Sequence, residues 1–131
     1  MVFINDLEGV ELEKLVAKAI YGDKVNILIE DGGVFIQHKV GLGMKAQFNP
    51  LTSDKIGLKV VQTVLESGKY EIRPAWRGTI AVSNYRMDGN KVDLNDDGQY
   101  VRGVGSTVVE ACCKALVAEH FGDYLGRLKD E

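Results

Sequence analysis

The stretch from Gly103 to Gly122, GVGSTVVEACCKALVAEHFG, constrains the fold most strongly. Thr107 followed three positions later by Glu110 forms a capping box, which predicts that a helix starts near Thr107. The preceding glycines, Gly103 and Gly105, permit a close approach between the incoming strand and this helix. Residues at three- and four-residue steps then predict one buried helix face: Val109, Cys112, Cys113, Leu116, Val117, His120 and Phe121.

Two earlier segments also have helical patterns. Residues 11–20, ELEKLVAKAI, place apolar side chains at helical spacing, and Gly22 is a natural stop. Residues 50–54 contain Pro50, Thr52, Ser53 and Asp54, which are typical of helix starts, before IGLKVVQTVLE. We expect this second helix to end at Ser67-Gly68.

The strand patterns occur in pairs. Residues 24–30 and 34–40 are rich in β-formers and flank Asp31-Gly32-Gly33, which predicts a hairpin, and residues 41–49 are expected to form a loop. Residues 69–76 and 79–87 predict a second hairpin joined at Arg77-Gly78. Residues 99–104 predict one more strand.

The segment from residue 88 to residue 98, DGNKVDLNDDG, is polar and rich in turn residues. It is either a long loop or a loop with a short extra strand around residues 91–94. The chain therefore predicts an α+β fold with an antiparallel β-meander sheet and an N-terminal β-hairpin, packed by three α-helices as an α-β-α sandwich. At 131 residues, 45% of them hydrophobic, we expect residues 1–131 to form one domain.

Charge and hydropathy narrow the range of functions. A formal net charge of −3 argues against a protein that coats duplex DNA. The opening MVFINDLEGVELEKL has acidic residues where a secretory signal needs a basic start, and no stretch approaches the length of a membrane span. We therefore expect a cytoplasmic protein that binds neither DNA nor membranes.

The sequence predicts no metal site and no disulfide. Cys112 and Cys113 are adjacent, which disfavours a bond between them, and no second cysteine pair completes a zinc site. Asp93-x-Asn95-x-Asp97-Gly98 resembles the first half of a calcium loop, but the twelfth position is Val104 where a glutamate is needed. We interpret this segment as a turn between strands.

No set of residues predicts catalysis or a cofactor. His120 has no serine or second histidine nearby in the sequence, and a general acid and base poised together are not evident. GVGSTV lacks the third glycine of the dinucleotide signature. The start of the helix at Thr107 nevertheless offers backbone amides that favour an anion such as a phosphate.

Aromatic residues and arginines gather on the predicted meander. Flat rings stack on bases, arginines pair with phosphates, and an asparagine reads the edge of a purine. The alternative is that the rings cover the edge of the sheet while the arginines reach into water. Both interpretations concern the same residues: Trp76, Arg77, Asn84, Tyr85, Arg86, Tyr100 and Arg102.

Three blocks of the chain resemble a known family. ELEKLVAKAIYGD, NPLTSDKIGLKVVQTVLE and GSTVVEACCKALVA are similar to successive blocks of the phage ABA sandwich domain family, over nearly the whole chain. The family's usual tryptophan in the second helix is absent, and residues 88–98 look longer than usual. Within or near this group are the Thoeris anti-defence sponges, which sequester cyclic ADP-ribose isomers and, in some members, cyclic oligonucleotides.

The resemblance implies a function without catalysis. A sponge in the infected bacterial host would bind a cyclic nucleotide immune signal without cleaving it, as a homo-oligomer with pockets at subunit interfaces. The chemistry of the meander, and not the resemblance, suggests the residues: Arg77, Arg86, Arg102 and the helix start at Thr107 for phosphates, Trp76 and Tyr85 for stacking on bases, and Asn84 for the edge of a purine. Arg127, in the C-terminal GDYLGRLKDE, would reach a neighbouring subunit's pocket or lie in a solvated tail.

Two other functions stay open. A phage accessory protein would bind a host protein through a sheet edge or an exposed helix, and it would take up no small ligand. A nucleotide-processing enzyme would need the acid and base that the sequence does not display. We rank the sponge first, the accessory protein second and the enzyme last.

Overall fold

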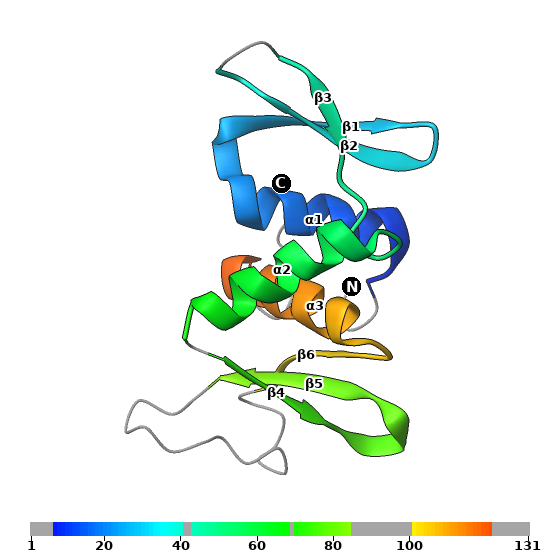
Figure 1. The fold of residues 1–131 in the computed structure, drawn as a ribbon, viewed down its shortest axis with the longest axis vertical. Coiled ribbons are helices and arrows are strands. Elements are labelled where there is room, and N and C mark those ends of the chain that lie inside the picture. Colours follow the sequence, from blue (N-terminus) through cyan, green and yellow to red (C-terminus); the bar gives the residue numbers. More distant parts are fainter. Residues whose placement is uncertain (1–6, 41–42, 69, 85–100, 122–131) are drawn as a thin grey trace.

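The structure is a computed structural model that describes residues 7–40, 43–68, 70–84 and 101–121. Its elements confirm a mixed α+β fold. In chain order they are α1 (Gly9–Tyr21), η2 (Gly22–Lys24), β1 (Val25–Glu30), β2 (Gly33–His38), β3 (Lys45–Gln47), α2 (Asp54–Glu66), β4 (Tyr70–Pro74), η3 (Trp76–Gly78), β5 (Ile80–Asn84), β6 (Val101–Gly105) and α3 (Val108–Phe121) (Figure 1).

The helices form the middle layer of the molecule. Figure 1 shows them between two separate three-stranded sheets, β1-β2-β3 on one side and β4-β5-β6 on the other. Helix α1 contacts β1 and β2, α3 contacts β5 and β6, and α3 contacts both other helices. The predicted α-β-α order, with helices packed on a single sheet, therefore differs from the arrangement in the structure.

The cause of this arrangement is the burial of α3 on almost every side. Its buried residues are Ala111, Cys112, Cys113, Lys114, Ala115, Val117 and Ala118. A helix that is apolar all round belongs in the interior and needs cover on more than one side. The predicted stripe included the two cysteines and Val117 but missed the three alanines. It also included His120, which is exposed.

The first sheet contains the predicted hairpin. Asp31 and Gly32 have φ angles of 50° and 75°, as the two central residues of a type I′ turn require. Glu30 and Gly33 close the turn as a pair, so Gly33 already belongs to β2. The hairpin prediction is confirmed, with the second strand ending at His38 instead of residue 40.

The prediction that residues 41–49 form only a loop is wrong. β3 lies within this segment and pairs antiparallel with β2, with Ala46 opposite Ile36. Lys45 of β3 also forms an ion pair with Glu30 of β1, at 2.8 Å between Nζ and Oε2. Pairing with the rest of the sheet therefore overrides the turn-rich local composition.

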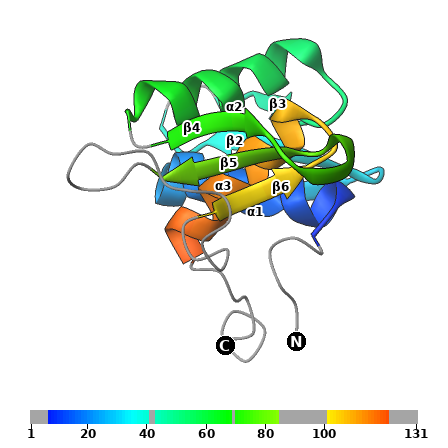
Figure 2. The same cartoon turned by 90° about the horizontal axis from the view of Figure 1, so that it is seen from below.

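The second sheet is an antiparallel meander. Figure 2 shows β4, β5 and β6 side by side in front of the helices. The β4–β5 turn includes Arg77 and Gly78, as predicted, and both have positive φ angles, of 58° and 75°. The possible extra strand at residues 91–94 and the calcium-like segment at residues 93–98 lie outside the described residues.

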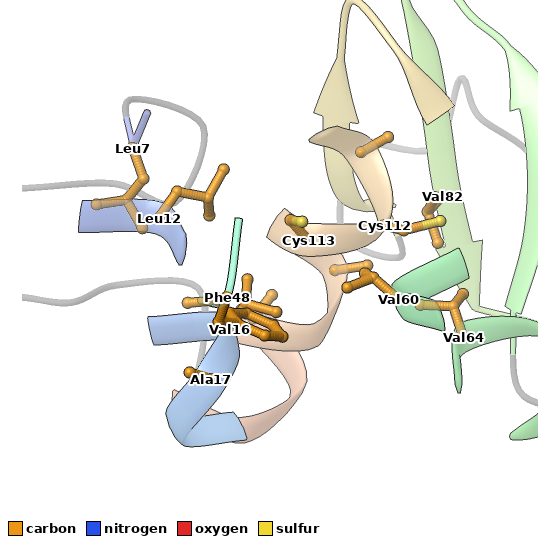
Figure 3. Packing of buried hydrophobic residues seen from close by; sticks show 14 of the residues in the cluster. Leu7, Leu12, Val16, Ala17, Phe48, Val60, Val64, Val82, Cys112 and Cys113 are labelled. Carbon is orange, nitrogen blue, oxygen red and sulfur yellow. The ribbon is translucent and has the colours of Figure 1, made fainter. Parts of the chain in front are cut away.

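The core joins both sheets through the helices. Leu12 and Val16 of α1, Val60 and Val64 of α2, and Val82 of β5 are fully buried in the same cluster as the cysteines of α3. Figure 3 shows Cys112 pointing to the Val82 side of α3 and Cys113 pointing away from it. Among the described residues, no helix is long and apolar enough to cross a membrane.

Two glycines of β6 let the strand lie directly against the backbone of α3. A Cβ atom at Gly103 would lie 2.2 Å from the Ala111 carbonyl oxygen and 2.6 Å from the Ala115 nitrogen. A Cβ atom at Gly105 would lie 2.9 Å from the Ala111 nitrogen. The predicted close approach of strand and helix is confirmed, and main-chain atoms on both sides leave no room for a side chain.

We expect Gly103→Ala to lower the free energy of unfolding by about 3 kcal/mol, because overpacking against backbone forces the helix away from the strand. Urea denaturation followed by circular dichroism measures this loss. Gly33→Ala is the matched control, since a Cβ there meets the flexible Gln47 amide at 3.3 Å. Equal stability of the two variants would contradict the close contact between β6 and α3.

Candidate functional site

The structure divides the predicted ligand residues between the two ends of the second sheet. Trp76 and Arg77 lie in η3, at the end where Ile80 pairs with Gly105 and the chain turns towards Thr107. Asn84 and Arg102 lie near the opposite end. The five residues of β5 separate the two groups by roughly 13 Å at the rise of an extended strand.

Most of the predicted ligand residues have no described side chain. For Trp76, Asn84 and Arg102 the structure describes the backbone position only, while Tyr85 and Arg86 lie outside the described residues. Arg127 also lies outside them. The structure therefore describes the side-chain surroundings of two predicted ligand residues, Arg77 and Thr107.

Arg77 occupies an unusual backbone position. Its φ and ψ angles of 58° and 40° are left-handed, a conformation that non-glycine residues adopt uncommonly. The Ala75 N–H donates to the Thr79 carbonyl at 2.8 Å and closes the turn around it. The side chain is exposed at the tip of this turn, so it is accessible to a ligand.

Thr107 caps α3, as predicted. Its Oγ1 accepts a hydrogen bond from the Glu110 N–H at 3.1 Å. The Glu110 carboxylate also lies at this helix start, where it accepts from the Ser106 hydroxyl at 3.1 Å and from Lys114 Nζ at 3.1 Å. A carboxylate of the chain itself therefore lies beside the helix start at which a phosphate was expected to bind.

Lys114 and Ser106 stabilise the charged form of this carboxylate. Burial opposes ionisation of Glu110, but the hydrogen bond and charge of Lys114, together with the contacts to Ser106, lower its pKa overall. Lys114 is itself almost fully buried. The positive charge nearest to the helix start is thus engaged within the fold.

Both thiols of α3 are buried. Cys112 and Cys113 both have 0% exposure, which agrees with the prediction that they are packing groups. Burial raises the pKa of Cys112 to about 11, and burial together with neighbouring negative groups raises the pKa of Cys113 further. Neither thiol supplies a thiolate nucleophile near neutral pH.

The remaining sequence candidates show no catalytic arrangement. His120 is exposed, and its ring packs edge-to-face on Phe121 with centroids 4.5 Å apart. Within the described part of the chain, no group of three or more His, Cys, Asp or Glu residues could hold a metal ion.

A cleft that the sequence did not reveal lies between α2 and the first sheet. We call it the α2 cleft; its volume is about 440 Å³. Ile36, Phe48 and Val60 form its buried apolar floor, with exposures of 7%, 3% and 0%. Its exposed rim is polar: Gln47, Lys59, Gln62, Thr63 and Glu66.

Three rings meet at one side of the α2 cleft. Tyr21 packs edge-to-face on His38, with centroids 5.8 Å apart, and on Phe48, with centroids 6.0 Å apart. Tyr21 ends α1, His38 ends β2 and Phe48 follows β3, so the folded sheet brings together residues that are distant in the sequence. Within its own segment, each of these residues has the pattern of a core or boundary residue. No local pattern therefore predicts that the three rings meet.

The rim of the cleft has one positive and one negative group, Lys59 and Glu66, both on α2. The Thr63 hydroxyl donates to the Lys59 carbonyl at 2.8 Å, so Thr63 faces the cleft with an acceptor oxygen. The amides of Gln47 and Gln62 each offer a donor and an acceptor. Arg77 and Thr107, the two predicted ligand residues with described side chains, do not line this cleft.

We expect Glu110→Gln to lower the free energy of unfolding by about 1 kcal/mol at neutral pH, because its charged carboxylate accepts hydrogen bonds from the Ser106 hydroxyl and from the almost fully buried Lys114 Nζ. A carboxyl with a lowered pKa stabilises the fold above its ordinary value, 4.5, and loses that contribution as pH falls through the lowered pKa. The gap between variant and wild type should therefore close below pH 4.5. Urea denaturation at several pH values measures it.

Glu8→Gln provides the control for this prediction. Glu8 is at the N-cap of α1, but its side chain forms no capping hydrogen bond. Its substitution should leave the acid dependence of stability close to that of the wild type. Parallel curves for wild type and Glu110→Gln would show that Glu110 does not stabilise the start of α3 through its charge.

We expect both thiols of the native protein to resist alkylation by iodoacetamide at pH 8. At that pH a thiol with the pKa of Cys112 is ionised in roughly one molecule in a thousand, and burial blocks the reagent as well. Mass spectrometry should find alkylation only after unfolding in urea. Rapid labelling of either cysteine in the folded protein would contradict its buried position.

Comparison with known proteins gives no family for this chain. No protein-family model matches it, and no curated protein matches it. The similarity to phage ABA sandwich domains and to the Thoeris sponges therefore stays a prediction from the sequence.

Proposed function

We propose that this chain binds and sequesters a cyclic nucleotide immune signal, without cleaving it, as a phage anti-defence protein in the cytoplasm of the infected bacterium. The α2 cleft is the observation that carries the proposal. Its volume of about 440 Å³ falls within the range of small-molecule sites. An apolar floor with a polar rim suits a ligand that has flat rings and charged groups.

The lining of the α2 cleft matches the parts of a nucleotide. A base would lie over the apolar floor beside the ring of Tyr21, which is half-buried. Lys59 would attract a phosphate, and the amides of Gln47 and Gln62 would pair with base or sugar edges. Glu66 would accept from a sugar hydroxyl, which favours a ribose-containing ligand over a bare polyphosphate.

The buried thiols and the lining of the α2 cleft support sequestration over turnover. The buried thiols have raised pKa values, and the groups that line the α2 cleft contain no serine or cysteine. A protein that competes with a sensor for a scarce signal needs affinity and slow release, which a rigid preformed cleft provides. The proposed family similarity also implies a homo-oligomer, and exposed Arg77 stays a candidate for a second contact to the ligand.

We expect the protein to retain a cyclic nucleotide and return it chemically unchanged. The test incubates it with cyclic ADP-ribose isomers and cyclic di- and trinucleotides, removes free ligand, releases bound ligand by heat and identifies it by mass spectrometry. Ligand at a hundred times its dissociation constant should also stabilise the fold by about 2.7 kcal/mol. Altered ligand would indicate an enzyme, and absence of uptake would favour the accessory protein that binds a host protein.

We expect Lys59→Ala to weaken retention by roughly tenfold, as loss of a charged contact to phosphate should. Lys55→Ala is the matched control, because Lys55 is an exposed lysine one helical turn earlier on α2 and does not line the cleft. Arg77→Ala tests the turn of the second sheet in the same assay. Full retention by Lys59→Ala together with loss in Arg77→Ala would move the site from the α2 cleft to the β4–β5 turn.

A further inference from the structure

Among the described residues, no strand pairs with the outer edge of β1. β1 is an edge strand of the sheet β1-β2-β3. On the side that faces β2, the Lys39 N–H donates to the Lys24 carbonyl at 3.0 Å. Hydrogen-bonded positions alternate along an antiparallel pair, so even-numbered residues of β1 bond to β2. The N–H and C=O groups of Val25, Ile27 and Ile29 therefore point outward. We call these three residues the β1 edge.

The β1 edge lacks several of the features that commonly prevent strand pairing. Its strand is six residues long, VNILIE, and contains neither proline nor lysine. The β1–β2 register runs from Val25 to Glu30 without a bulge. By contrast, β4 ends in Pro74, and β3 at the other edge of the first sheet has only three residues. An open, regular and apolar edge is a template for a further strand.

A second cleft, of about 410 Å³, lies between β1 and the ends of helices α1 and α3. It is lined by Val25 and Ile27 of β1, Phe121 and His120 of α3, and Lys18 and Asp23 near the end of α1. Ile29 belongs to the same inward-facing row of β1 as Val25 and Ile27, yet its exposure is 49%. The edge thus carries an exposed apolar side chain near one end and a hollow beside the other.

We propose that β1 pairs antiparallel with β1 of a second copy of this chain, around a two-fold axis at Ile27. In this register Ile29 of each copy lies opposite Val25 of the other, beside the second cleft. A two-fold interface requires such self-complementarity, in which a projection on one subunit meets a hollow on its partner. All outward groups of the β1 edge then face outward groups of the partner strand.

Charge selects the same register. With Ile27 opposite Ile27 of the partner subunit, Lys24 lies opposite Glu30 of the partner subunit, and the symmetry repeats this contact. Glu30 is exposed, and within the chain it pairs with Lys45 of β3. If the partner strand shifted by one residue, backbone groups already bonded to β2 would lie opposite the free groups of the other strand. If it shifted by two residues, Lys24 would no longer lie opposite Glu30 of the partner subunit. Exposed charge pairs add little affinity, but they fix register.

The proposed pairing does not depend on nucleotide binding. It rests on the edge, the second cleft and the charges of the free chain, and its test needs no ligand. If the ligand assay failed, the proposed β1 pairing would not be affected. If the protein were a monomer that retains nucleotide, the β1 pairing would be overturned and the proposed function would not.

The first test measures molar mass by sedimentation velocity across a dilution series. We expect wild type to approach twice its 14.4 kDa chain mass, and Ile29→Pro to sediment as a monomer with an unchanged circular dichroism spectrum. The Ile29 N–H points outward, so proline there blocks the edge without removing a hydrogen bond to β2. Leu58→Gln, at an exposed residue of α2, is the control and should leave the mass unchanged.

Charge reversal tests the register and avoids any effect of proline on folding. Lys24→Glu and Glu30→Lys should each weaken association at least about tenfold, because like charges then face each other twice. An equimolar mixture of the two variants should associate again. In the mixed dimer the two substituted side chains face each other with opposite charges, and the two unsubstituted ones restore the original pair. Hydrogen exchange should show protection of the Val25, Ile27 and Ile29 amides that disappears on dilution.

Three outcomes would overturn the proposal. Wild type that stays monomeric at all concentrations is the first. A dimer that survives both Ile29→Pro and the charge reversals is the second, since it must use another surface. Concentration-independent protection of the β1 edge is the third, because it would mean that the chain covers this edge itself.

Discussion

Direct contact between the backbone of α3 and the backbone of β6 determines how the rest of the molecule is arranged. Gly103 and Gly105 carry no side chain, so Ala111 and Ala115 of the helix lie against the strand itself. The small residues of α3 then bury it on its other sides against α1 and α2. Because α3 lies in the centre, the helical layer is covered by one sheet on each side, and no single sheet lies between the helices. The same small-residue contact recurs at Gly57, where a Cβ would lie 2.8 Å from the Pro50 carbonyl oxygen and 3.0 Å from Val109.

The same contact limits what the opening of α3 can bind. Because β6 leads directly into the helix, Ser106, Thr107 and Glu110 satisfy the helix start from within the chain. The Glu110 carboxylate forms an ion pair with buried Lys114 one turn later, so a phosphate bound at this helix start would have a negative charge beside it. A glycine-led helix start is therefore not sufficient for an anion site. The residues of its first turn must also leave its amides and charge unoccupied.

Local patterns predicted the elements well, because caps, turns and apolar spacing act over a few residues. Ser53 accepts from the Ile56 N–H at 3.3 Å as the start of α2 required, and the Asp31-Gly32 turn formed as expected. The sequence did not reveal β3, the division into two sheets or the α2 cleft, because these depend on contacts between distant segments. Tyr21, His38 and Phe48 illustrate this: no spacing relates them, yet their rings meet at one cleft. The arginines and aromatics of the meander formed a compositional signal, but the described ones lie at separate ends of a sheet.

The two clefts lie at opposite edges of the first sheet, so the proposed ligand site is separate from the proposed dimer contact. The α2 cleft includes Ala46 and Gln47 of β3, whereas the second cleft adjoins β1 at the opposite edge of the same sheet. Pairing through the β1 edge would therefore leave both α2 clefts of a dimer open to solvent. The family similarity implies pockets at subunit interfaces. In the proposed β1-paired dimer, the second cleft would lie at the subunit interface and the α2 cleft would not. A ligand that bound in the α2 cleft would then be held by one subunit alone, so its affinity should not depend on protein concentration.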